Sequence, residues 1–265
     1  DDLGSKIGFA GIRFLFAGIL VTIIAIIQKR KFKVEQKSVV AWLLLFALVN
    51  TALHYLFSYV GLGYLPSSRS TILDSMNGFF AIILSCIIFE DDKFSKFKAL
   101  GCILGFGGIL LINIEPGQNF FQGISFRGDG MILLNAMCGA FGGIITRIIS
   151  KKMDMTVATS LSMTIGGAFL CVVSAIIGPA ARWTITTESI IIMIGLILIS
   201  AVCFGVYNQL LAYHPISKIA IFNAFIPILG VIFSSIILGE PMRVKYIIAG
   251  CIVALGVYVM NHFSK

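Results

Sequence analysis

Charged side chains inside apolar runs are the residues of this sequence best placed to do chemistry. Arg13 and Asp74 each lie about six residues inside a run long enough to cross a membrane. A charge at the centre of such a span costs roughly 2.5–3.5 kcal/mol on insertion scales, so each needs a partner or a task. Three interpretations stay open: an ion pair between Arg13 and Asp74 that locks two helices, an Asp74 that senses a proton or an amine, and an Arg13 that extends to the membrane surface beside an unrelated Asp74.

A polar and aromatic stripe runs along the apolar stretch 39–60. Its members recur at every fourth position in two neighbouring rows: Asn50, His54 and Ser58, and Thr51, Tyr55 and Tyr59. That spacing places each row on one face of an α-helix. Because hydrocarbon offers polar groups no partner, the stripe must face protein or water. The stripe therefore predicts either the lining of a cavity or hydrogen bonds between helices. Its histidine, His54, is either a hydrogen-bonded residue that packs between helices or a proton relay.

The second half of the chain carries a comparable set of polar residues. Ser200, Phe204, Tyr207 and Asn208 follow one face of the run 188–212. The amide side chain of an asparagine inside a span also requires hydrogen-bond partners. Three asparagines are therefore further cavity candidates: Asn77, Asn135 and Asn223. The candidate substrate contacts are therefore Asn50, His54, Tyr55, Asp74, Asn77, Asn135, Tyr207, Asn208 and Asn223.

Signatures of catalysis and of bound cofactors are absent from the sequence. It contains no HExxH, no GxSxG, no phosphate-binding loop and no Cys/His metal spacing. Its six cysteines fall inside apolar runs without CxxC spacing, which is typical of small packing residues. We therefore expect no catalytic residue, no metal, no cofactor and no enzymatic activity. If transport is energised, Asp74 or His54 would carry the proton.

Membrane-spanning helices must position these residues. Of the 265 residues, 58% are hydrophobic and 12% are charged, whereas soluble domains have about 45–50% and about 25%. A bilayer core takes about 20 helical residues. Nine runs are apolar enough to cross it: 7–27, 39–60, 68–89, 97–114, 129–149, 156–178, 188–212, 217–238 and 244–262. The sequence predicts an all-α polytopic membrane protein.

Basic residues predict how these helices are oriented. Thirteen Lys and Arg residues fall in the loops of one side and six in the loops of the other. Lys and Arg concentrate in cytoplasmic loops, so the richer side should face the cytoplasm. We expect a protein of the cytoplasmic membrane with its C-terminus inside. The cations lie in short loops between spans, which does not indicate nucleic-acid binding.

The chain repeats itself after 149–150 residues. "GYLPSSRST" aligns with "AYHPISKIA", and "CIIFED" aligns with "IILGEP", which places Glu90 on Glu240. "GCILGFGGIL" (101–110) then aligns with "GCIVALGVYV" (250–259). We expect the two glutamates to cap helix ends or lie among lipid headgroups, and the glycines to let helices approach closely.

The repeat predicts two halves of opposite orientation. They cover 1–115 and 129–265, joined by a linker at 116–128. The second half has five runs and the first has four, so the partner of 129–149 would precede Asp1, in a parent protein of ten helices. Because five is odd, the second half enters the membrane from the other side. That is the inverted-repeat plan of many secondary transporters.

Three segments resemble a known family. They are Arg13-Phe14, "PISKIAIFNAFIPILGVIFSSIILGEP" (215–241) and "GCIVALGVYVMN" (250–261). In these the chain is similar to the EamA branch of the drug/metabolite transporter superfamily. The resemblance implies ten helices, cytoplasmic termini, and a central cavity lined by the first, third and fourth helices of each half. It also implies export or exchange of small metabolites by alternating access.

Two functions follow from these observations. The first is a secondary transporter, with export as its direction, that moves small organic metabolites across the cytoplasmic membrane and draws on a proton if coupled. The alternative is a membrane sensor or assembly partner that keeps the fold without transporting. A hydrated polar cavity favours the transporter, and a cavity filled by apolar side chains favours the sensor. Partners are then a small molecule and the lipid bilayer.

Overall fold

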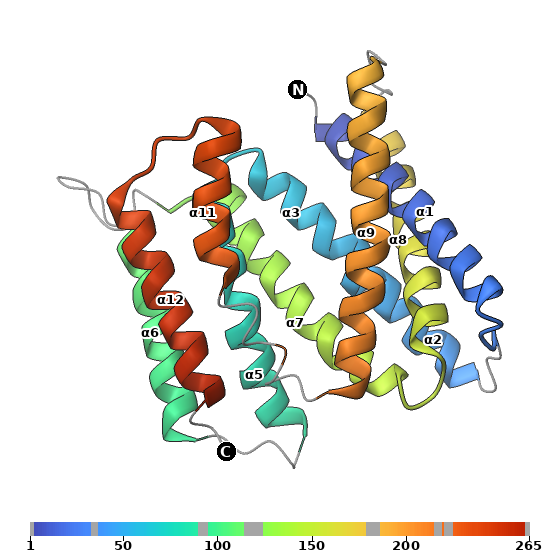
Figure 1. The fold of residues 1–265 in the computed structure, drawn as a ribbon, viewed down its shortest axis with the longest axis horizontal. Coiled ribbons are helices and arrows are strands. Elements are labelled where there is room, and N and C mark those ends of the chain that lie inside the picture. The colour runs from blue at the N-terminus through green and yellow to red at the C-terminus, as the bar shows by residue number, and fades with distance from the viewer. Residues whose placement is uncertain are drawn as a thin grey trace. The chain divides into compact units, whose positions relative to one another are not determined.

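The computed structural model describes residues 3–32, 37–89, 95–113, 124–178, 186–214, 219 and 225–262. Within these ranges all regular structure is helical (Figure 1). In chain order the helices are α1 (Leu3–Ile27), α2 (Lys37–Phe46), η1 (Ala47–Leu53), α3 (His54–Leu62), α4 (Ser67–Asp74), α5 (Met76–Ile88), α6 (Lys96–Asn113), η3 (Phe126–Gly130), α7 (Met131–Ile149), α8 (Met155–Ile177), α9 (Thr187–Tyr213), α11 (Phe225–Leu238) and α12 (Val244–His262). The segments η1 and η3 are short π-helices.

Six stretches of the described chain are helical, long and apolar enough to cross a membrane. They are Leu3–Ile27, Ser38–Leu62, Ser67–Ile88, Phe126–Ile149, Met155–Ile177 and Thr187–Tyr213. The 18-residue α6 and two shorter apolar helices, Ile226–Leu238 and Val244–Val259, occupy the remaining predicted runs. The prediction of an all-α polytopic membrane protein is confirmed, and helix ends agree with the predicted runs to within a few residues wherever both ends are described.

Side-chain caps explain where two of the long helices begin. At the start of α8 the Asp154 carboxylate accepts hydrogen bonds from the backbone N–H groups of Thr156 and Val157. At the start of α9, Thr186 and Ser189 bond reciprocally to each other's backbone N–H groups, which forms a capping box. Both caps satisfy N–H groups that have no partner inside the helix, and so set the first residue of each span.

The chain forms two compact units. Unit 1 comprises residues 1–59 and 141–214, and unit 2 comprises residues 60–140 and 215–265. Each unit takes helices from both predicted repeats, and the chain passes from one unit to the other within α3 and within α7. A repeat in the sequence is therefore not a compact unit in space, and the predicted repeat boundaries remain a prediction.

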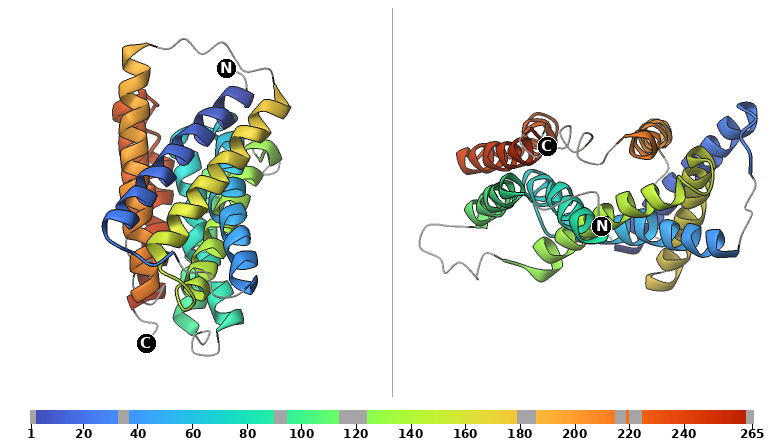
Figure 2. Two further views of the ribbon diagram at one scale, coloured as in Figure 1. Left: turned by 90° about the vertical axis from the view of Figure 1, so that its right-hand side faces the viewer. Right: turned by 90° about the horizontal axis from the view of Figure 1, so that it is seen from below.

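In unit 1, α1 lies beside α8 (Figures 1 and 2). Small residues allow this contact: a Cβ added to Gly11 would lie 2.7 Å from the Cys171 backbone nitrogen, and one on Gly18 would lie 2.5 Å from that of Thr164. Close approach at small residues is the usual basis of helix packing in membranes, where the hydrophobic effect between helices is missing. The fully buried Phe14 fills the core beside this contact.

In unit 2, α6 packs along α12 in the same manner (Figure 1). A Cβ on Gly108 would lie 3.0 Å from the Ala249 carbonyl oxygen, and one on Gly256 would lie 2.8 Å from the Gly101 carbonyl oxygen. Each helix therefore contributes a glycine that meets the backbone of the other helix. The predicted close approach of α6 is confirmed, and each helix packs against its own copy, as a two-fold arrangement of inverted repeats requires.

Candidate functional site

The strongest polar cluster of unit 2 joins two of the predicted residues. The Asn135 amide of α7 donates a hydrogen bond of 2.6 Å to the Asp74 carboxylate, at the end of α4. Asn135 is buried and Asp74 is half-buried. Among the described residues of this unit, no Lys or Arg forms an ion pair with Asp74. The carboxylate therefore lies in a span with an amide donor as its identified partner.

A break in the helix holds Asp74 in place. The span Ser67–Ile88 is interrupted at Ser75, which separates α4 from α5 and bonds through its hydroxyl to the Ile72 carbonyl. Asp74 thus lies at the end of one helical piece and directly before the positive N-terminal end of the next. Ser75 itself keeps a right-handed helical backbone, with φ −62° and ψ −13°, so the irregular turn lies within one continuous span.

Open space lies one turn further along α5. Gly78 is buried, yet a Cβ added there would meet no described atom within 4 Å. The predicted candidate Asn77 precedes it and is half-buried. Three apolar residues near Asp74 and Asn135 in the chain are fully buried and belong to one hydrophobic cluster of unit 2: Ile72, Met76 and Ala136. The geometry combines an acid, two amides and unfilled space, which suits a small polar ligand.

Two carboxylates from other parts of unit 2 anchor the start of α4. Arg69 forms a buried ion pair with Asp129 of η3, with Nη2–Oδ1 and Nε–Oδ1 distances of 2.6 and 2.8 Å. Glu240 accepts hydrogen bonds from the Ser67 N–H at 2.7 Å, the Ser68 N–H at 3.1 Å and the Ser68 hydroxyl at 2.8 Å. With its first turn held this way, α4 presents Asp74 at a defined position.

Glu240 lies outside the spans and its titration follows from these bonds. Burial by itself would raise the pKa of this carboxyl, but hydrogen bonds from Ser234, Ser67 and Ser68 outweigh it and lower the pKa. The prediction that Glu240 caps a helix end is confirmed, although the helix it caps is 173 positions away in the chain. Glu90 lies outside the described residues.

The second polar cluster, in unit 1, surrounds Arg13 of α1. Its Nη1 donates to the Tyr59 hydroxyl at 3.4 Å. The guanidinium lies 4.4 Å from the ring centroid of Phe14 and 5.2 Å from that of Tyr55. Tyr55 packs in turn on Phe14 and Phe204, with centroid distances of 4.0 and 6.0 Å. The Arg13 charge is therefore held mainly against aromatic faces.

The predicted stripe is divided among three neighbouring helices. Asn50 lies with its amide oxygen against Gly142 of α7, where an added Cβ would be 2.4 Å away. Thr51 shares a hydrogen bond of 3.1 Å with Ser162 of α8, and the two tyrosines of the stripe face α1. The expectation of a regular α-helical stripe needs correction, because Ala47–Leu53 is a π-helix. A π-turn contains more residues than an α-turn, so residues four positions apart no longer lie directly above each other on one face. Short π-helical segments are frequent at functional sites.

The remaining candidates differ in exposure. His54 lies edge-on to Tyr55, with ring centroids 4.9 Å apart. Asn208 is buried and donates to the Thr159 hydroxyl at 3.1 Å, whereas the adjacent Tyr207 is 38% exposed. Asn223 lies outside the described residues. The substrate-binding roles of all these residues stay predictions, as does the Arg13–Asp74 pair, whose members belong to different units.

The residues that sequence reasoning missed are Asp129 and the serines bonded by Glu240. One sequence signal could have indicated the ion pair of Asp129. This acid begins an apolar run, and the nearest cation in the sequence is Arg127. Within the part of the chain that the structure describes, no three His, Cys, Asp or Glu residues are grouped so as to hold a metal ion.

Comparisons with known proteins agree with this arrangement. Residues 4–114 and 126–262 match the sequence model of the EamA-like transporter family. The uncharacterized transporter YvbV of Bacillus subtilis is 27% identical over 261 residues, covering 97% of this chain and 83% of its own. A chloroplastic WAT1-related protein of Arabidopsis thaliana is 25% identical, covering 95% of this chain and 62% of its own.

A solved crystal structure shows the same fold. It superposes with a TM-score of 0.70 at 10% sequence identity, and the match covers 98% of this chain and 89% of the other. At that identity the likeness concerns the fold alone.

Proposed function

Since the chain belongs to the EamA-like transporter family, we propose that it is a secondary transporter that exports small organic solutes across the cytoplasmic membrane by alternating access. The C-terminus then faces the cytoplasm, where Lys and Arg are more frequent in the loops. The protein moves its solutes without transforming them.

The Asp74 carboxylate carries this proposal. An acid inside a span is costly and is retained where it does work on a proton, an ion or a substrate. Here it is bonded to Asn135, half-buried, and placed at a helix break beside unfilled space at Gly78. A locked structural pair would instead place a cation against the carboxylate, and the described part of unit 2 places none there.

The first turn of α4 supports a role in gating. Arg69 and Glu240 fix this turn, while the break at Ser75 leaves α5 joined to it by a single residue. Bending at Ser75 would move Asn77 relative to the anchored Asp74 without breaking the anchored end. Small changes at such hinges are sufficient to expose a site to one side of the membrane and then to the other.

An efflux assay with the full-length protein tests the proposal. Cells or proteoliposomes are loaded with a panel of amino acids, amines, nucleosides and sugars, and release is compared for wild type, Asp74→Asn and Glu188→Gln. Glu188 is an exposed acid at the start of α9, so the control makes the same chemical change outside the site. We expect Asp74→Asn to reduce release at least about tenfold and Glu188→Gln to leave it unchanged.

Two results would contradict the proposal in different ways. Equal release by wild type and Asp74→Asn would remove Asp74 from the mechanism while keeping the transporter. Absence of release for every solute by the folded wild-type protein would favour the sensor or assembly partner. Solute-dependent acidification or alkalinisation of the vesicle lumen, lost in Asp74→Asn, would identify the proton as the coupled ion.

A further inference from the structure

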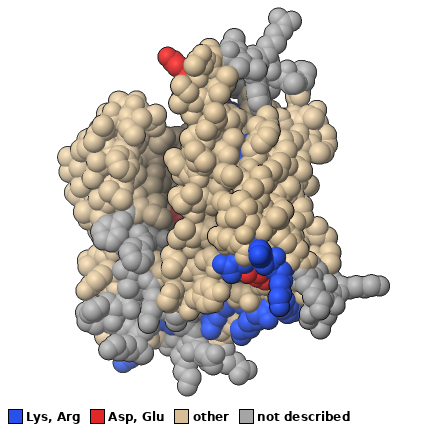
Figure 3. Space-filling model, turned by 45° about the vertical axis from the view of Figure 1, so that its right-hand side comes forward, with Lys and Arg blue, Asp and Glu red and all other residues tan. Residues whose placement is uncertain are grey.

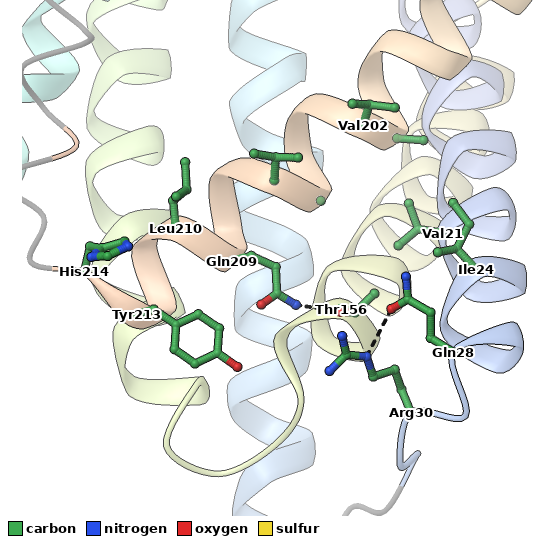
Figure 4. Close-up of a pocket in the computed structure, with 13 residues that line it drawn as sticks. Val21, Ile24, Gln28, Arg30, Thr156, Val202, Gln209, Leu210, Tyr213 and His214 are labelled. Carbon is green, nitrogen blue, oxygen red and sulfur yellow. Dashed lines mark hydrogen bonds between the residues drawn. The ribbon is translucent and has the colours of Figure 1, made fainter.

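Unit 1 contains an apolar groove along two membrane-spanning helices. It has a volume of about 500 Å³ and lies between α1 and α9, with Val21 and Ile24 on one wall and Val202 and Leu210 on the other (Figure 4). Gly205 forms part of the floor, and a Cβ added there would meet no described atom within 4 Å. The groove therefore has the form and the chemistry of a site for a hydrocarbon chain.

A basic hollow adjoins this groove at one end. It has a volume of about 710 Å³ and shares Gln28, Arg30 and Tyr213 with the groove. Four cations and one carboxylate line it: Lys29, Arg30, Lys31, Lys152 and Asp154. The molecular surface shows Lys and Arg gathered around an acidic residue at one end of the molecule (Figure 3). The excess of positive charge favours an anionic group in this hollow.

Arg30 is oriented toward the shared region. Its Nε donates to the Gln28 amide oxygen at 3.1 Å (Figure 4). Its Nη1 lies 3.4 Å from the Asp154 carboxylate. Its side chain remains 42% exposed, so the guanidinium still has N–H groups directed to solvent. Asp154 also caps α8 through its other oxygen and is thus shared between two tasks. A planar guanidinium held in this way suits bidentate binding of a phosphate.

The two hollows lie at the level where a membrane changes from hydrocarbon to headgroups. Within this unit α1 ends at Ile27, α8 begins at Met155 and α9 ends at Tyr213, so three spans terminate around the basic hollow. Tyr213 is 76% exposed, as expected for an aromatic residue of the membrane interface. The apolar groove extends from this level into the span.

We propose that this double site binds a phospholipid with an anionic headgroup. One acyl chain lies in the groove over Gly205, and the phosphate lies at Arg30 with Lys29, Lys31 and Lys152 around it. A free anion would use the basic hollow alone and would leave the groove unexplained. The apolar groove suits the acyl chain of a lipid and the adjoining basic hollow suits its anionic headgroup. Basic pockets between membrane helices bind such headgroups in other proteins.

Native mass spectrometry of the full-length protein tests this site. The protein is titrated with phosphatidylglycerol, with phosphatidylcholine of the same acyl chains, and with soluble glycerol 3-phosphate. We expect phosphatidylglycerol to bind at least about fivefold more tightly than phosphatidylcholine, because the choline cation offsets the phosphate charge and is repelled by the surrounding Lys and Arg side chains. Glycerol 3-phosphate should bind weakly because it leaves the groove empty.

Two sets of variants separate the parts of the site. Arg30→Gln should lower phosphatidylglycerol binding about fivefold. Arg30→Lys should restore only part of it, because an ammonium keeps the charge but cannot bind the phosphate in bidentate fashion. Lys96→Gln, an exposed charge of unit 2, should change nothing. Gly205→Leu fills the groove and should abolish binding of the acyl chain. Gly195→Leu makes the same change on the same helix, also without a clash, and should bind as wild type does.

Four results would overturn the proposal. Three are equal binding of the two phospholipids, wild-type binding by a Gly205→Leu variant that melts normally, and tight binding of glycerol 3-phosphate that Gly205→Leu does not alter. The last would indicate a site for a soluble anion. Binding that Gly205→Leu and Gly195→Leu lower equally would indicate a general effect on α9 and would also contradict the proposed groove.

Discussion

Unit 1 and unit 2 stabilise a charge several residues inside a span by different means. Arg13 in unit 1 spreads its charge over the rings of Phe14 and Tyr55 and makes one long hydrogen bond to a hydroxyl. Asp74 in unit 2 makes a short hydrogen bond to an amide, on a helix whose start is held by an ion pair and a cap.

The difference follows from the chemistry of the two charges. A guanidinium can rest on π faces, which are soft and tolerate small displacements. A carboxylate requires N–H donors in defined directions, and these require rigid supports. We therefore infer that unit 1 can adjust around its charge, whereas unit 2 moves as fixed pieces joined at Ser75. Three predictions test this inference.

The largest effect is expected on removing the anchor of unit 2. Arg69→Ala leaves the buried Asp129 carboxylate without its cation, with the Ser125 N–H as a remaining hydrogen-bond donor, which should lower the free energy of unfolding by about 3–5 kcal/mol. Equilibrium unfolding in mixed micelles measures the loss. Arg127→Ala, two residues before Asp129 and exposed, is the control and should cost less than about 0.5 kcal/mol. An Arg69→Ala loss as small as that of the control would show that α4 is not rigidly held.

A smaller effect is expected at the cation of unit 1. Arg13→Gln should cost about 1–2 kcal/mol, and Arg13→Lys should recover part of it because an ammonium keeps the attraction to the rings without the planar stacking. The same unfolding assay applies. The double variant Arg13→Gln with Asp74→Asn sharpens the comparison. If the two charges are independent, the losses of unfolding free energy in the single variants add up in the double variant. A departure from additivity above about 1 kcal/mol would establish the ion pair.

The smallest effect is expected at the cap of α4 and depends on pH. The lowered pKa of Glu240 means that its contribution is complete above the ordinary value of 4.5 and is lost as the pH falls through the lower value of the folded protein. The unfolding free energy of wild type should therefore decrease below about pH 4.5 by about 1 kcal/mol more than that of Glu240→Gln. Glu188→Gln serves as control. Parallel pH profiles for wild type and Glu240→Gln would show that the cap contributes nothing.

Much of the architecture was predictable because it depends on local properties. Apolar runs of span length predict each helix, and the match of "GCILGFGGIL" to "GCIVALGVYV" predicts that α6 and α12 are equivalent. The candidate site was predicted in part: Asp74 and Asn135 were both named, but not as partners.

The contacts that sequence reasoning missed share one physical cause. The Glu240 cap joins residues 173 positions apart, and the Arg69 ion pair joins residues 60 apart. Such contacts depend on how helices cross, and helical periodicity within one span carries no information about crossing. The π-turn at Ala47–Leu53 was missed for a related reason, because one extra residue in a turn leaves composition and hydropathy unchanged.

The contact between α6 and α12 has the character of an isologous dimer interface built into one chain. The two helices are copies of one segment and pack on each other, as equivalent surfaces of subunits related by a two-fold axis do, and glycines of both helices allow the contact. Such an interface closes on itself and offers no further copy a place to add. Substitution of Gly108 or of Gly256 by alanine should therefore lower stability, because in both cases the added Cβ meets the backbone of the partner helix.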